Sequence, residues 1–270
     1  MVRTDLAAEA KELWENSPEN TTKLQGVCAR EQGNLTWVEI LDARGEEALG
    51  KPVGNYVTLE LSPYGRDARG AAEDLARVLQ KLCRPELGDS VLVVGLGNRA
   101  VTPDALGPKT VDRLFLTRHL IEGFPRTFGT CRSVSALVPG VLATTGVETL
   151  ELVRGAVDHI RPRCIICVDA LAAGSVERLC NTIQCCDAGI APGSGVGNCR
   201  AAFSRESLGV PVYAIGIPTV VDAGTDSPMI VTPRDIDERI RYLSGVVAGG
   251  LNRFLHPDFS YDDFNQFVTF

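Results

Sequence analysis

The chain has 270 residues, of which 44% are hydrophobic and 23% are charged, as is usual for a globular protein. This length suits one large domain or two small ones. The formal net charge of −7 argues against a nucleic-acid-binding surface as the main function. No run of about 18 apolar residues occurs, so the sequence predicts no membrane-spanning helix.

Hydrophobic spacing predicts helices and strands along most of the chain. The predicted helices cover residues 5–16, 70–82, 109–121, 146–160 and 235–254. The predicted strands cover residues 37–41, 56–61, 91–97, 133–137, 164–168 and 210–217. Strand and helix alternate through the middle of the chain, which is typical of right-handed βαβ units and a mainly parallel sheet. We expect the early strand pair to form an edge or a small antiparallel addition.

Nine cysteines are an odd number, so a complete set of internal disulfides is impossible. Cys164 and Cys167 have the spacing of zinc ligands, but they lie inside an apolar run. In a strand they would point to opposite faces, so we expect reduced, buried thiols and no zinc site. The first residues also lack the apolar segment of a signal peptide. These features predict a cytoplasmic protein in a reducing compartment.

An aspartate follows each of two strongly apolar predicted strands. Asp104 comes shortly after the run 91–97, and Asp169 directly follows the run 164–168. The carboxyl ends of parallel strands meet at one edge of a sheet, where ligands bind in open α/β folds. Two carboxylates facing one crevice can share a proton, hold a metal or activate a water. The alternative is an ordinary structural role, because aspartate is common in turns and as a helix N-cap.

Two glycine-rich segments have the appearance of ligand-binding loops. Gly95-Leu-Gly97 follows a strand, but it lacks the third glycine and the downstream acidic residue of a dinucleotide-binding site. The segment 192–198 has three alternating glycines whose N–H groups can face an anion or an extended peptide. A flexible turn is the alternative for this segment, which also lacks the ending of a phosphate-binding loop.

Other catalytic patterns are missing from the sequence. Asp222-Ala-Gly-Thr225 lacks the hydroxyl residue that directly follows the aspartate in pepsin-like proteases, and no second copy occurs. No H-E-x-x-H pattern supports a zinc peptidase, and no Gly-x-Ser-x-Gly elbow holds a serine nucleophile. By elimination, Asp104 and Asp169 are the best-placed polar groups.

Four segments resemble the germination protease family of spore-forming bacteria. They are Val2-Arg-Thr-Asp-Leu-Ala7; Val94-Gly-Leu-Gly-Asn98 with Val101-Thr-Pro-Asp-Ala-Leu-Gly-Pro108; Ser135-Ala-Leu-Val-Pro-Gly140 with Val168-Asp-Ala-Leu-Ala-Ala173; and Pro192-Gly-Ser-Gly-Val-Gly-Asn198 with Ile215-Gly-Ile-Pro-Thr-Val-Val-Asp-Ala223. The resemblance implies a single-domain, three-layer α/β sandwich, distantly similar to hydrogenase maturation peptidases. It further implies an endopeptidase that begins the degradation of small acid-soluble spore proteins during germination, in the cytoplasm of the forespore and in the spore core.

The resemblance also implies particular residues and an assembly. The aspartates that the family uses match Asp104 and Asp169, as an atypical aspartic-type pair with no cofactor. We expect a homotetramer that binds neither nucleic acid nor membrane. The loop residues Gly193, Ser194, Gly195, Gly197 and Asn198 then become candidates for substrate binding, because their N–H groups can pair with an extended peptide.

A preference for cutting after an acidic residue and before a hydrophobic residue and alanine can be applied to the chain itself. Asp5-Leu6-Ala7 fits this preference, so the resemblance implies self-cleavage of a zymogen between Asp5 and Leu6. Residues 1–5 would then be a short propeptide and residues 6–270 the peptidase domain. The family usually has a longer leader, and it also has a longer segment after the position of Asp222.

Two alternatives to the aspartic mechanism stay open at this point. One is a metal-dependent peptidase of the hydrogenase-maturation type at the same crevice, since carboxylates suit hard or borderline cations. The other is a non-catalytic α/β domain that binds a ligand or a partner, because one fold supports many functions.

Overall fold

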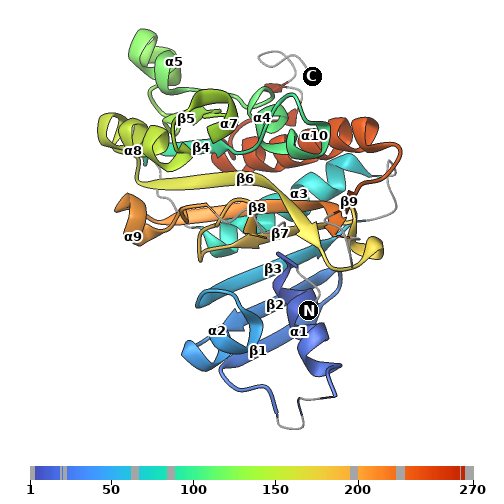
Figure 1. Ribbon diagram of the computed structural model, residues 1–270. Helices are drawn as coiled ribbons and strands as arrows, with labels where there is room; N and C mark the ends of the chain where they lie inside the picture. Colours follow the sequence, from blue (N-terminus) through green and yellow to red (C-terminus); the bar gives the residue numbers. More distant parts are fainter. Residues whose placement is uncertain are drawn as a thin grey trace.

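The computed structural model describes residues 4–18, 20, 23–61, 67–83, 89–194, 200–222, 229–261 and 263–264. Within these ranges, one nine-stranded sheet has the order β1-β2-β3-β7-β8-β6-β4-β5, with β9 paired to β8 (Figure 1). The strands are β1 Val27–Gln32, β2 Leu35–Ile40, β3 Gly54–Glu60, β4 Val91–Gly95, β5 Val134–Leu137, β6 Cys164–Ala173, β7 Thr182–Cys186, β8 Val212–Asp222 and β9 Ile230–Val231. The predicted α/β class is confirmed.

The helices lie between these strands. The α-helices are α1 Ala7–Glu15, α2 Ala43–Leu49, α3 Ala68–Leu82, α4 Leu106–Val111, α5 Arg118–Gly123, α6 Pro125–Phe128, α7 Leu142–Thr145, α8 Thr149–Ile160, α9 Arg205–Leu208 and α10 Ile236–Leu255. Two short 3-10 turns are η1 Thr102–Asp104 and η2 Val176–Arg178.

The centre of the sheet is parallel and comprises β5, β4, β6 and β8. Every residue of β4 is buried, as expected for an apolar strand covered on both faces. β4 ends at Gly95, which lies beside Val168, whereas β6 continues to Ala173. The prediction that this strand ends at residue 168 was therefore wrong. Beyond Val168, β6 has an edge that β4 does not cover.

The antiparallel side of the sheet comprises β1, β2, β3 and β7, and β7 joins it to β8. This addition is larger than the predicted strand pair. β1 and β7 were not predicted. Five of the six residues of β1 are exposed, and its three apolar residues precede three polar ones without the alternation of a half-buried strand.

Helices cover both faces of the sheet, which gives the expected three layers (Figure 1). On one face, α3 and α10 pack together over the largest hydrophobic core cluster. A glycine permits this close packing, because a Cβ at Gly250 would lie 2.8 Å from Leu75. On the other face, α8 covers β4 through Val153, and α1 covers β2 and β3.

The predicted helix over residues 109–121 is divided into α4 and α5. The break has a tertiary cause. The Asn252 side chain of α10 accepts the Phe115 N–H at 2.9 Å and donates to the Arg113 carbonyl at 3.0 Å. These bonds replace intrahelical ones, so local helix propensity does not decide the conformation here.

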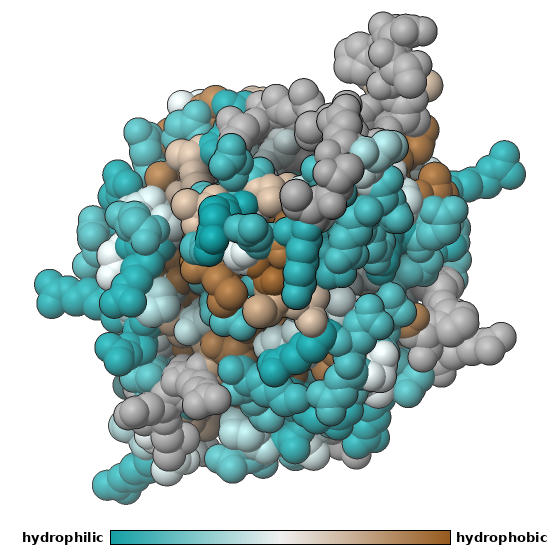
Figure 2. All heavy atoms as spheres, turned by 90° about the horizontal axis from the view of Figure 1, so that it is seen from below, coloured by the Kyte–Doolittle hydropathy of each residue, from teal (hydrophilic) through white to brown (hydrophobic). Residues whose placement is uncertain are grey.

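Figure 2 views the molecule from below, on the side of β1, β2, α1 and α2. Most of this face is hydrophilic, but hydrophobic atoms gather in hollows near its centre. Among the described helices, none combines the length and apolar character needed to cross a bilayer.

Candidate active site

Asp104 lies in η1, where the chain folds back onto the end of β4. The fold-back passes through Gly97, whose φ of +104° is a conformation that favours glycine. A Cβ on Gly97 would lie 2.0 Å from the Asp104 carbonyl oxygen. The Asn98 N–H donates to Asp104 Oδ2 at 2.7 Å. The Gly-Leu-Gly segment therefore builds a tight turn that holds a carboxylate.

Asp169 lies inside β6 and is only 5% exposed. Its Oδ1 accepts the N–H of the next residue, Ala170, at 2.9 Å. Although β6 continues beyond it, Asp169 is level with the point where β4 has ended, since Val168 pairs with Gly95. Asp169 thus lies at the edge of the parallel sheet as expected, because the neighbouring strand β4 is shorter than β6 and ends beside Val168.

The two carboxyl groups line one cavity of about 510 Å³. Burial raises the pKa of Asp169 well above its ordinary value, and the negative charge of Asp104 raises it further. Burial also raises the pKa of half-buried Asp104, while the hydrogen bond from the Asn98 N–H lowers it. Of the pair, Asp169 therefore has the stronger tendency to keep its proton.

A second cavity of about 780 Å³ adjoins the first. Asp5, Asp169 and Gly193 line both cavities. The wall between the two cavities therefore contains a residue of the expected cleavage site, a residue of the aspartate pair and a residue of the glycine-rich loop.

The expected cleavage site, Asp5-Leu6, lies in this wall. The Asp5 N–H donates to the Ala172 carbonyl at 2.9 Å, and the Ala172 N–H donates to Asp5 Oδ2 at 2.9 Å. Leu6 is fully buried in a small apolar cluster with Leu171, Leu179 and other side chains. The sequence reasoning therefore selected a segment that the fold brings against β6, next to Asp169.

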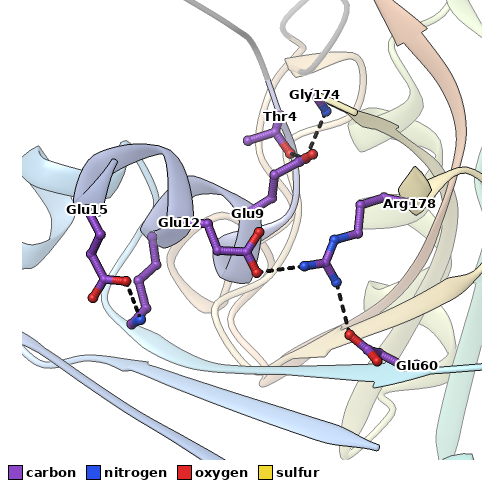
Figure 3. Close-up of polar contacts among 8 residues, drawn as sticks. Thr4, Glu9, Glu12, Glu15, Glu60, Gly174 and Arg178 are labelled. Carbon is purple, nitrogen blue, oxygen red and sulfur yellow. Dashed lines mark hydrogen bonds and ion pairs between the residues drawn. The ribbon is translucent and has the colours of Figure 1, made fainter. Parts of the chain in front are cut away.

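Residues around this segment attach it to the body of the protein (Figure 3). The buried carboxylate of Glu9 accepts the Thr4 hydroxyl and the Gly174 N–H. Nearby, Arg178 forms ion pairs with Glu12 of α1 and Glu60 of β3. Helix α1 is thus anchored directly after the expected cleavage site.

The glycine-rich loop is described only in part. Gly193 lines both cavities, and the Ser194 hydroxyl donates to Asp5 Oδ1 at 2.7 Å. Gly195, Gly197 and Asn198 lie outside the described residues. Within the part that is described, the loop faces the N-terminal segment.

Two residues that bind the N-terminal segment, Gln184 and Lys51, were not identified from the sequence. The Gln184 carboxamide donates to the Asp5 carbonyl at 3.0 Å and accepts the Ala7 N–H at 2.7 Å. The Lys51 ammonium donates to the Thr4 carbonyl at 2.8 Å. The one available signal was that Gln184 is a polar residue between apolar neighbours in a short β-prone run.

Among the described residues, the cysteines and possible metal ligands add no further site. Cys164 and Cys167 pack into different core clusters on opposite faces of the sheet, as predicted, and both are free thiols. Across the described ranges, no three side chains of His, Cys, Asp or Glu come together as metal ligands.

Comparison with known proteins identifies relatives along almost the whole chain. A germination protease of Caldanaerobacter subterraneus subsp. tengcongensis is 41% identical, and the match covers 99% of this chain and 98% of the relative. A germination protease of Priestia megaterium is 50% identical, over 82% of this chain and 64% of the relative.

A comparison with solved structures gives a weaker match. A [NiFe] hydrogenase maturation protease from Thermococcus kodakarensis matches with a TM-score of 0.41 and 19% identity, covering 64% of this chain and 98% of that chain.

The model of the germination protease family matches residues 5–228. The chain therefore belongs to the germination protease family of peptidases.

Proposed function

We propose that this chain is an aspartic-type endopeptidase that begins the degradation of small acid-soluble spore proteins during germination. The observation that carries the proposal is that Asp104 and Asp169 line one cavity, where burial and the Asp104 charge raise the pKa of Asp169. Burial and a neighbouring like charge both favour the protonated form of Asp169, and hydrolysis by an acid–base pair requires one protonated and one ionised carboxyl group.

The two carboxyl groups take different roles in this mechanism. Asp104, which is half-buried and accepts the Asn98 N–H, is the ionised member and removes a proton from the attacking water. Asp169, buried and protonated, donates to the oxygen of the scissile carbonyl. When the tetrahedral intermediate collapses, the carbon–nitrogen bond breaks, Asp104 passes its proton to the leaving amine, and a hydroxyl of the intermediate returns a proton to Asp169 as the carbonyl forms again.

The same site processes its own chain in this proposal. Cleavage between Asp5 and Leu6 releases residues 1–5 and leaves residues 6–270 as the active peptidase domain. The lining of the aspartate cavity includes Asp5, which supports a reaction at this bond. The acidic residue, leucine and alanine at positions 5–7 match the proposed substrate preference of acid, hydrophobic residue and alanine.

The proposal extends to assembly and location. We propose a homotetramer in the cytoplasm of the forespore and in the spore core, with spore proteins as its substrates and without direct nucleic-acid binding. Light scattering coupled to size-exclusion chromatography would measure the assembly, and a monomer at working concentration would contradict it.

The main test is incubation of the purified full chain with an acid-soluble spore protein, followed by N-terminal sequencing of all products. We expect one new terminus at Leu6 of the enzyme and new substrate termini that begin with a hydrophobic residue and alanine. The same incubation with excess chelator separates the aspartic mechanism, which keeps its activity, from a metal-dependent peptidase, which loses it. A chain that cleaves nothing would favour the binding-domain alternative.

A further inference from the structure

The N-terminal segment is bound at an edge of β6 that β4 leaves uncovered. β4 ends at Gly95, which lies beside Val168, and the N–H of the next residue, Leu96, donates to the Val168 carbonyl at 2.8 Å. Four residues further along β6, both main-chain groups of Ala172 pair with Asp5. Asp5 thus bonds to the part of the β6 edge that β4 does not cover, through one main-chain and one side-chain hydrogen bond.

The side chain of Asp5 is surrounded by hydrogen-bond donors. Its Oδ2 accepts the Ala172 N–H at 2.9 Å, and its Oδ1 accepts the Ser194 hydroxyl at 2.7 Å. The Lys51 ammonium donates to the adjacent Thr4 carbonyl, and the charge of Asp5 acts on the Lys51 pKa, raising it against the larger lowering by burial. Donors and a cation around one carboxylate form a binding site for an acidic side chain.

The main chain on both sides of Leu6 is held by one side chain. Gln184, which is buried, donates to the Asp5 carbonyl at 3.0 Å and accepts the Ala7 N–H at 2.7 Å. The carboxamide therefore fixes the peptide across the Asp5–Leu6 bond. It also supplies a hydrogen-bond donor to the carbonyl oxygen of that bond.

We infer that Ser194, Gln184 and the main chain of Ala172 form the subsite that recognises the acidic residue of a peptide substrate, and that Asp5 occupies this subsite in the unprocessed chain. The inference rests on the proposed function. Hydrolysis adds water across the Asp5–Leu6 bond, giving a carboxyl group on Asp5 and an amino group on Leu6. The released segment then exposes the same donors to the acidic residue of another peptide.

The subsite distinguishes an acid from its amide by charge and by the number of acceptor oxygens in the bound side chain. An asparagine in place of the acid has one acceptor oxygen, and its NH₂ group cannot accept a hydrogen bond from a second donor. Hydrogen bonds to a charged group are also stronger than those to a neutral group. We expect a preference for Asp over Asn of roughly tenfold to a hundredfold in kcat/KM.

The experiment uses the self-processed protein and two peptides that differ only in Asp or Asn before Leu-Ala. In the wild type, kcat/KM should favour the Asp peptide. Ser194→Ala should reduce that preference to about threefold or less. Gln184→Glu keeps the acceptor and loses the donor, so it should lower kcat/KM for both peptides by about tenfold or more. Ser175→Ala is the matched control, because Ser175 N-caps η2 and lines neither cavity.

A second measurement does not depend on the folding of any variant. The pentapeptide Met-Val-Arg-Thr-Asp should inhibit the processed wild type by returning to the subsite, and the version ending in Asn should inhibit at least tenfold more weakly. Equal inhibition by the two pentapeptides, or an unchanged Asp preference in Ser194→Ala, would overturn the inference while leaving the protease function intact. A wild-type chain that cleaves neither itself nor either peptide would instead overturn the proposed function.

Discussion

Two regions of this molecule bind carboxyl groups in opposite ways. At the end of β4, Asp104 and Asp169 each accept one main-chain N–H among the described residues, and burial raises the pKa of both. In the wall between the two cavities, the Asp5 carboxylate accepts hydrogen bonds from the Ala172 N–H and the Ser194 hydroxyl. The carboxyl groups with a single donor are the ones to which we assign proton transfer, and the carboxylate with two donors is the one to which we assign recognition.

The largest expected effect comes from neutralising the first region. Asp104→Asn and Asp169→Asn should each lower peptide cleavage by about 10²- to 10⁴-fold, because each removes one proton-transfer group. Initial rates on an acid–Leu–Ala peptide would measure the loss, together with mass spectrometry of the N-terminus.

Asp112→Asn is the matched control for this experiment. Asp112 caps the end of α4, pairs with Arg99 at the surface and lines neither cavity. It should keep nearly full activity. If Asp104→Asn and Asp169→Asn also process and cleave normally, the division between a reactive and a recognised carboxylate fails.

The second effect concerns the turn that places Asp104. Gly97→Ala should lower the free energy of unfolding by about 2–4 kcal/mol, since it combines a positive φ with a clash against the Asp104 main chain. Gly33→Ala has a positive φ of +61° but open space around it, so it should lose only about 1 kcal/mol. Chemical denaturation of both variants would test the difference, and equal losses would show that the clash is relieved.

The third effect is a pH dependence that belongs to Asp169. Its raised pKa means that the folded protein keeps a proton which the unfolded chain has lost above about pH 4. The unfolded state then binds fewer protons, so the free energy of unfolding falls as pH rises towards the folded-state pKa, by about 1.4 kcal/mol per pH unit. The free energy of unfolding of Asp169→Asn, measured by urea denaturation between pH 4 and 8, should depend less on pH than that of the wild type. Parallel pH profiles of the two proteins would contradict the assignment.

The smallest expected effect concerns the ion pair that attaches α1 to Arg178. Glu12→Gln removes one of the two ion pairs of Arg178, and Glu12 is half-exposed, so the loss in stability should be only about 0.3–0.5 kcal/mol. The loss should shrink further in 1 M salt. A loss above about 2 kcal/mol would show that this ion pair contributes far more than a surface pair.

The sequence predicts the parallel centre of the sheet well and the contacts of the N-terminal segment poorly, for a physical reason. A continuous apolar run such as that of β4 identifies a buried strand by itself, and the aspartates that follow such runs could be found in the same way. The contacts of the N-terminal segment join residues far apart in the chain, since Asp5 contacts Ala172 and Gln184 across 167 and 179 positions. No local pattern identifies Gln184 or Lys51 as partners of Asp5.

Two other errors have the same origin. The predicted helix over residues 109–121 is interrupted because the side chain of Asn252, more than 130 positions away, satisfies the main chain at Arg113 and Phe115. β6 was predicted five residues too short because Asp169 looks like the end of a strand. Its main chain continues to pair with β8 as far as Ala173, with a shift of register after Leu171, which propensity alone does not reveal.

The shared wall between the two cavities has a consequence for the shape of the processed enzyme. Asp5 is one of the residues that separate a space of about 510 Å³ from one of about 780 Å³, and each is large enough for only a few side chains. In the proposed processing, departure of the first five residues removes Asp5 from that wall, while Asp169, Ala170, Leu171 and Gly193 remain in it. The proposed cleavage would thus widen the passage between the two cavities beside the aspartate pair, on the side where a substrate peptide would lie.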